Sequence, residues 1–186
     1  MADAARHLFT ACGFQNTRMA QISAAAGIKV GQIYRDFDSK EAIVAEIVAA
    51  DIAEFLNEET LERAIESRDP VALRHWITNF ICDSDPDEGR LLAQIIVEAT
   101  RNERISSLFQ QGDRRISACL RRAVAAIAPH APAKACDDFV QMIMVLLLGL
   151  PQRHLAVPNT DLAAVSASLS ALIDRELDRL TQLSAA

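Results

Sequence analysis

A run of polar side chains near the start of the chain carries hydrogen-bond donors and acceptors at helical spacing. Lys29, Gln32 and Arg35 recur every three residues and would share one face of a helix. An amide pairs bidentately with adenine, a guanidinium forks onto guanine, and the neighbouring Tyr34 adds a hydroxyl. The pattern predicts contact with base edges in the major groove of DNA. The alternative is an ordinary solvated helix surface, with the ring of Tyr34 packed inward.

The flanking residues predict two short helices joined by a tight turn, within residues 17–37. Thr17 is expected to cap the first helix, and Gly27-Ile28 supplies the turn. One side of each helix is apolar and is expected to be buried: Met19, Ile22 and Ala26 in the first, then Val30, Ile33, Tyr34 and Phe37 in the second. This is a helix-turn-helix whose second helix presents its polar side outward.

Two further helices frame this motif. The first is predicted from the apolar spacing of Ala5, Leu8, Phe9 and Cys12, and Gly13 ends it. Another long helix is expected to begin after a cap at Asp38 or Ser39 and to run to about Leu56. We therefore predict a helix-turn-helix DNA-binding domain over residues 1–46 and an effector-binding and dimerisation domain over residues 47–186.

The charge distribution permits a DNA contact only in the first of these domains. The whole chain has a net charge of -6 at pH 7, which argues against a general nucleic-acid binder. The first 45 residues nevertheless carry a small basic excess, with Arg6, Arg18, Lys29, Arg35 and Lys40 against Asp3, Asp36, Asp38 and Glu41. The remainder is strongly acidic, so only the N-terminal part is suited to a phosphate backbone.

The composition indicates an all-α protein with an N-terminal three-helix domain and a larger C-terminal helical domain. Hydrophobic residues make up 51% of the chain and aromatic residues 5%, while the chain has only 6 Gly and 6 Pro. Helix formers dominate such a sequence. Amphipathic or apolar stretches continue this pattern through residues 73–80, 92–99, 105–120, 139–150 and 162–180.

Several other classes of protein find no support in the sequence. The cysteines (Cys12, Cys82, Cys119, Cys136) and the histidines (His7, His75, His130, His154) lack disulfide or metal-ligand spacing, so no metal or cofactor is expected. No nucleophile-base pairing or phosphate-binding glycine loop indicates an enzyme. The apolar run 142–150 is shorter than the ~20 residues of a membrane span. We expect a cytoplasmic protein.

The N-terminal residues resemble the DNA-binding domain of TetR-type (tetracycline-repressor-like) regulators. The resemblance runs from Ala4 to about Glu46 and is carried by Leu8-Phe9, Gly13-Phe14, Thr17, Ile22, Ala25-Ala26-Gly27-Ile28, Gly31, Ile33-Tyr34, Phe37 and Ser39-Lys40-Glu41-Ala42. It departs from the family pattern at Ala20-Gln21, where an Arg-Asp pair is common, and in lacking a basic arm before the first helix. Those departures leave the operator sequence open.

The resemblance implies a role for each matching position. Thr17 and Tyr34 would bind phosphates, Arg18 would join the DNA contacts, and Lys29, Val30, Gln32 and Arg35 would face base edges. Lys40 would reach a phosphate from the first turn of the long helix, where free backbone amides already favour an anion.

Two further sites are expected in the C-terminal domain. A small-molecule effector would bind an apolar pocket, with candidate lining residues Trp76, Phe80, Ile96, Glu98, Phe109, Phe139 and Met142. The last two long helices resemble the family's four-helix dimer interface, with candidate contacts Met144, Leu147, Gly149, Leu162, Val165, Leu169, Leu172 and Ile173. A self-contained intrachain hairpin is the alternative, although a helix that is apolar nearly all round needs more cover.

These expectations combine into one hypothesis. The chain is predicted to be a homodimeric transcriptional repressor that a small, largely apolar ligand releases from a palindromic operator. An alternative is a helical small-molecule carrier or enzyme with a vestigial helix-turn-helix. A third possibility is a regulator whose larger domain answers to a protein partner and encloses no pocket.

Overall fold

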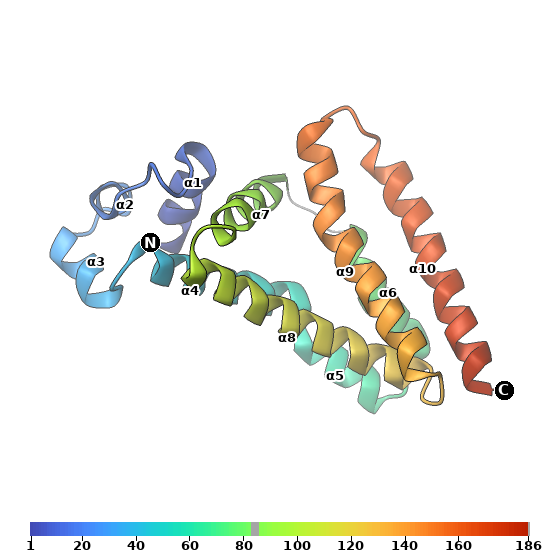
Figure 1. Ribbon diagram of the computed structural model, residues 1–186. Coiled ribbons are helices and arrows are strands. Elements are labelled where there is room, and N and C mark those ends of the chain that lie inside the picture. The colour runs from blue at the N-terminus through green and yellow to red at the C-terminus, as the bar shows by residue number, and fades with distance from the viewer. Residues whose placement is uncertain (83–85, 186) are drawn as a thin grey trace. The chain divides into compact units, whose positions relative to one another are not determined.

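The chain is built from helices, as expected, and contains no strand within residues 1–82 and 86–185 (Figure 1). These are the residues that the computed structural model describes, with the side chains of 80–88 and 185 left out of the description. The helices are α1 (Ala2–Cys12), α2 (Met19–Ala25), α3 (Val30–Asp36), α4 (Lys40–Leu56), α5 (Glu58–Glu66), α6 (Pro70–Cys82), α7 (Pro86–Ala99), α8 (Glu103–Ile127), α9 (Ala133–Ala156) and α10 (Leu162–Ala185). The all-α prediction is confirmed.

Two compact units make up the chain, and each is described by itself. Unit 1 comprises Met1–Ile52 and Asp87–Gly112, and unit 2 comprises Ala53–Pro86 and Asp113–Ala186. Helix α7 thus packs with the N-terminal helices, although it lies far along the sequence from them. The two units do not test the predicted domain division after residue 46, because each unit combines two separate segments of the chain. That division stays a prediction.

In unit 1, local backbone geometry sets the length of the first helices. Gly13 ends α1 with φ 81° and Gly27 follows α2 with φ 67°, a left-handed region that favours glycine. The expected cap at Thr17 is wrong: the residue at the cap of α2 is Arg18, whose backbone N–H donates to Gln21 Oε1 at 2.7 Å. Ser39 does act at the start of α4, accepting from the Ala42 N–H at 3.3 Å.

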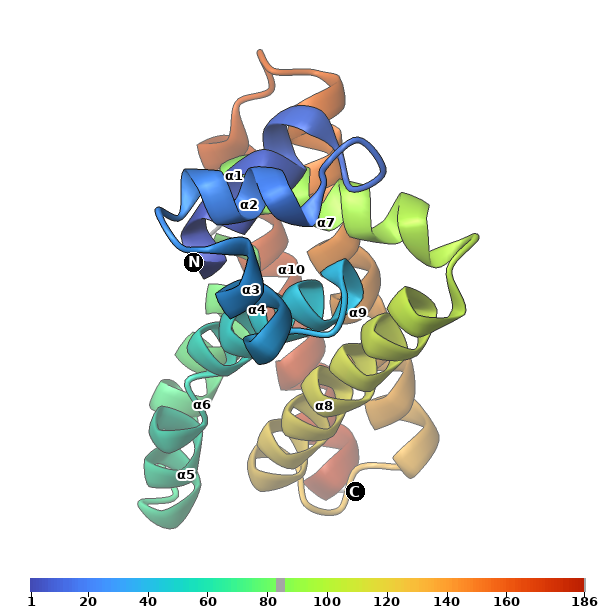
Figure 2. The ribbon, with the colours of Figure 1, turned by 90° about the vertical axis from the view of Figure 1, so that its left-hand side faces the viewer.

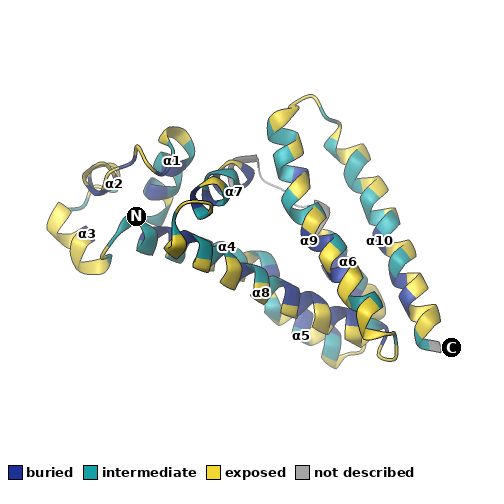
Figure 3. Cartoon of the chain, viewed as in Figure 1, coloured by how far each residue is buried: buried dark blue, intermediate teal, exposed yellow. Residues whose placement is uncertain are grey.

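The core of unit 1 holds these short helices in place. Helices α2 and α3 have seven residues each, too few to be stable alone. They are anchored by fully buried apolar side chains from several helices, namely Phe9, Ile22, Ile33, Ile43, Ile47 and Ile105 (Figure 3). The expected burial of Val30 is wrong, since its side chain is 45% exposed, and Tyr34, for which both positions were left open, is 53% exposed.

Unit 2 packs α5, α6, α9, α10 and the second part of α8 around an apolar interior. Trp76 is buried on α6 and its indole N–H donates to the Leu56 carbonyl at 2.7 Å. Helix α5 was not expected from the sequence. It begins after Asn57, whose φ is 40° and whose side-chain oxygen accepts from the Thr60 N–H at 3.3 Å.

The α9–α10 hairpin of unit 2 is only partly covered within the chain. The apolar segment of α9 leaves Val145 68% exposed and Leu147 half-buried. The first half of α10 is similar, with half-buried Leu162, Val165, Leu169 and Leu172, whereas its second half buries Leu177 and Leu180. Among the described helices, none has a stretch sufficiently long and apolar to traverse a bilayer.

Candidate nucleic-acid interface

Helices α2 and α3 form a helix-turn-helix around the Gly27 turn (Figure 2). The Ser23 hydroxyl closes the turn by donating to the Ile28 carbonyl at 2.6 Å, and the Ile28 N–H donates back to the Ser23 carbonyl at 3.0 Å. Only Ile33 of α3 is buried. The other side chains of α3 are exposed, so this short helix packs on the core through Ile33, with Ile28 and Phe37 beside its two ends, and presents the rest of its surface to solvent.

The exposed surface of α3 carries the predicted base-reading side chains. Lys29 lies at the cap of α3, and Val30, Gln32, Tyr34 and Arg35 follow on the helix, all exposed. The sequence left the position of Tyr34 open between buried and outward, and the structure places its side chain outward. One acidic neighbour competes for a cation, because Asp36 lies 3.6 Å from the Arg35 guanidinium.

Two of the predicted phosphate-binding side chains are already engaged inside unit 1. Thr17 is buried, and its hydroxyl donates to the carbonyls of Gly13 at 2.9 Å and Leu8 at 3.3 Å. Lys40 donates to the Phe14 carbonyl at 2.7 Å, and its ammonium lies 4.4 Å from the centre of the Phe14 ring. In this structure both residues stabilise the loop between α1 and α2. Arg18, by contrast, is exposed at the start of α2.

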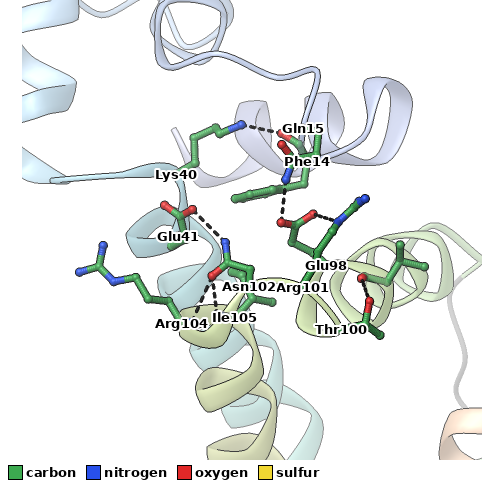
Figure 4. Close-up of polar contacts among 11 residues, drawn as sticks. Phe14, Gln15, Lys40, Glu41, Glu98, Thr100, Arg101, Asn102, Arg104 and Ile105 are labelled. Atoms are coloured by element: carbon green, nitrogen blue, oxygen red, sulfur yellow. Dashed lines mark hydrogen bonds and ion pairs between the residues drawn. The ribbon is translucent and has the colours of Figure 1, made fainter.

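Sequence reasoning missed a second polar cluster, which lies where α7 meets α8 (Figure 4). Asn102 donates to Glu41 at 3.1 Å, and Gln15 donates to Glu98 at 2.7 Å. Partial burial raises the pKa of Glu41, but hydrogen bonds from its own backbone, Ser39 and Asn102 and the charge of Lys40 leave that pKa below its ordinary value. The Glu41 carboxylate is thus kept ionised.

The comparison with known proteins connects this geometry to a family. Residues 2–47 match the model for bacterial regulatory proteins of the tetR family. The N-terminal region is thus similar to that of tetR-family regulators. This match confirms the resemblance found in the sequence, and over these residues it supports a DNA-binding regulatory function.

Solved structures extend the likeness to the whole chain at the level of the fold. A TetR transcription regulator of Haloarcula marismortui ATCC 43049 has a TM-score of 0.77 at 14% identity, covering 96% of this chain and 94% of that one. SmeT in complex with triclosan gives 0.75 at 20%, covering 96% and 88%. A protein of Saccharomonospora viridis described as a transcriptional regulator, in complex with choline, gives 0.71 at 17%, covering 93% of both chains. Among curated proteins, none matches this chain.

The predicted effector-pocket residues of this chain are divided between the two units. Trp76, Phe139 and Met142 belong to unit 2, whereas Ile96, Glu98 and Phe109 belong to unit 1; the side chain of Phe80 lies outside the described residues. Glu98 lines a small cavity of unit 1, together with Phe9, Phe14, Val44, Leu91, Gln94, Ile95 and Ile105. That cavity has room for about one water molecule, far less than an effector requires. No candidate metal cluster occurs among the described side chains.

The predicted dimer residues divide into two groups. Met144 and Ile173 are buried within the chain. The others are exposed or half-buried, namely Leu147, Gly149, Leu162, Val165, Leu169 and Leu172. A methyl group added at Gly149 would meet nothing within 4 Å, so this stretch of α9 is open to a close neighbour.

Proposed function

We propose that this tetR-family regulator binds a palindromic operator as a homodimer through the outward surface of α3. The observation that carries the proposal is the exposure of Lys29, Gln32, Tyr34 and Arg35 above a single buried anchor, Ile33. The side chains offer cations, an amide and a hydroxyl, which match base edges and phosphates. In a dimer, the two copies of α3 would enter successive major grooves about 34–36 Å apart.

The proposed second copy of the chain is supported by the apolar surface of the α9–α10 hairpin. Val145 is largely exposed, and the first half of α10 has four half-buried aliphatic side chains within 162–172. Two such hairpins packed together would bury these side chains in a four-helix arrangement. The neighbouring Gly149 would permit close approach of the two backbones.

We expect Val145→Glu to shift the dimer strongly towards monomer, because it places a charge in an interface that excludes water. Sedimentation velocity over a concentration series measures the shift, which should be at least about tenfold in dissociation constant. Val71→Glu is the matched control, since Val71 is 74% exposed on α6, outside the hairpin. Equal effects of the two variants would contradict the proposed interface.

The proposed role is repression in the cytoplasm, relieved by a small and largely apolar ligand. The support is that two structural neighbours hold small molecules, triclosan in one and choline in the other. Such a ligand releases DNA only if it binds the released form of the dimer more tightly than the operator-bound form. Repression, rather than activation, and the apolar character of the ligand both belong to this proposal.

Selection of bound fragments from bacterial genomic DNA, at moderate salt and with the full-length protein, tests the proposal. We expect enrichment of sites with two inverted half-sites separated by one helical turn or a multiple of it. Affinity for these sites should fall steeply as salt rises, because Lys and Arg contacts displace counterions. A dimer that enriches no inverted repeat would refute operator binding.

A further inference from the structure

The corner between α7 and α8, residues 98–102, makes a partly buried contact with the loop that leads into α2, in which Glu98 is buried and Gln15 is exposed. Glu98 is only 3% exposed, and its carboxylate accepts from Gln15 Nε2 at 2.7 Å and from Arg101 Nε at 3.1 Å (Figure 4). A buried carboxylate is costly unless such partners are present. Gln15 therefore has a fixed, charged acceptor in a segment more than eighty residues away.

The same corner makes a second contact at the start of α4. Asn102 Oδ1 accepts from the backbone N–H groups of Arg104 at 3.1 Å and Ile105 at 3.4 Å, which caps α8. Its Nδ2 donates to Glu41 Oε1 at 3.1 Å. The Asn102 side chain is thus oriented by its own helix while its amide holds a carboxylate in the first turn of α4.

These two contacts bracket the helix-turn-helix. Gln15 lies just before α2 and Glu41 just after α3, so one corner holds both ends of the segment that carries the base-reading residues. The corner is itself rigid, because the N–H groups of Arg101 and Asn102 both donate to the Glu98 carbonyl at 3.0 Å. Ile105 anchors it in the core of unit 1.

We propose that Glu98 and Asn102 are positioning residues for operator binding, which fix the orientation of α2 and α3 through Gln15 and Glu41. This inference rests on the proposed function. Neither residue needs to touch DNA. Loss of either contact would let the α1–α2 loop or the start of α4 shift, and the outward surface of α3 would match the groove less often.

The first test reverses the Asn102–Glu41 hydrogen bond. Asn102→Asp keeps a capping oxygen for α8 but sets two carboxylates against each other. We expect it to weaken binding to the selected operator about tenfold, the size of one lost hydrogen bond to a charged group. Adding Glu41→Gln restores an amide-carboxylate pair in the opposite direction, and affinity should return to within about twofold of the original.

A charge-matched control separates positioning from simple repulsion of DNA. Glu46→Gln, at an exposed position of α4 away from the contact, restores the net charge of Asn102→Asp without restoring the hydrogen bond. It should not rescue affinity. Wild-type affinity of Asn102→Asp, or equal rescue by Glu46→Gln and Glu41→Gln, would overturn the proposal. Gln15→Glu and its partner Glu98→Gln provide the same test at the other contact.

Amide hydrogen exchange of the free protein tests the positioning role separately from the proposed binding to an operator. Asn102→Asp should accelerate exchange in the first turn of α4 at least about fivefold, and Glu41→Gln should reverse this. If the wild-type protein binds no DNA, operator binding is refuted, yet accelerated and reversible exchange still establishes the contact. Unchanged exchange would overturn the positioning role whether or not an operator is found.

Discussion

Replacing Gln32 and Arg35 together with alanine is expected to lower operator affinity at least ~100-fold. Both side chains are exposed on α3, whose one buried residue is Ile33. Each bidentate base contact discriminates by about 1–3 kcal/mol, and a dimer loses every contact twice. Fluorescence anisotropy with the selected operator measures the loss, while the midpoint of thermal unfolding should stay nearly unchanged because no buried group is removed.

The chain offers a closely matched control for this double variant. Gln111 and Arg114 on α8 have the same residue types at the same spacing and are also exposed. Their joint replacement by alanine removes the same charge and amide from a surface outside the helix-turn-helix. Operator affinity should change by less than about threefold. Comparable losses in the two double variants would mean that α3 does not read the operator.

The second large effect is on stability. Phe9→Ala is expected to lower the free energy of unfolding by about 3–5 kcal/mol, because it empties the centre of the core of unit 1. Phe9 is buried, its ring centre lies 5.5 Å from that of Phe14, and it lines the small cavity that Glu98 also borders. Denaturant unfolding followed by circular dichroism measures the change.

An exposed apolar residue of the same unit provides the comparison for Phe9. Val97 on α7 is 54% exposed, so Val97→Ala should change the free energy of unfolding by less than about 0.5 kcal/mol. If Phe9→Ala were as mild as Val97→Ala, the packing around Phe9 and Phe14 would be wrong. Operator binding by Phe9→Ala should weaken as well, because Phe14 supports the loop that leads into α2.

Local signals in the sequence predicted most of the N-terminal helices. Gly13 and Gly27 end helices because their positive φ angles suit glycine, and this requirement is visible in residue type and position alone. The family resemblance rested on the same residues, and the match over residues 2–47 confirms it. Helix α5 was missed because it is short and most of its residues are polar or charged, so that it buries only Leu61 and Ala64.

The features that could not be predicted from the sequence are contacts between residues far apart along the chain. Glu98 was a candidate lining residue of the effector pocket; in the structure its carboxylate accepts from Gln15, and nothing in the spacing of either residue indicates the other. Lys40 was assigned to a phosphate, yet the nearby Phe14 carbonyl and ring take up its ammonium. The capping role of Asn102 could have been predicted from the sequence, since an asparagine just before an apolar helix is a typical cap.

The single anchor of α3 bears on how such a protein acquires new targets. With only Ile33 committed to the interior, substitutions at most other positions of this helix carry little folding penalty. Natural selection can therefore change the base preference through single substitutions, without first compensating for lost stability. A library randomised at positions 30, 32, 34 and 35 should yield folded variants at high frequency, many of them with altered half-site preference.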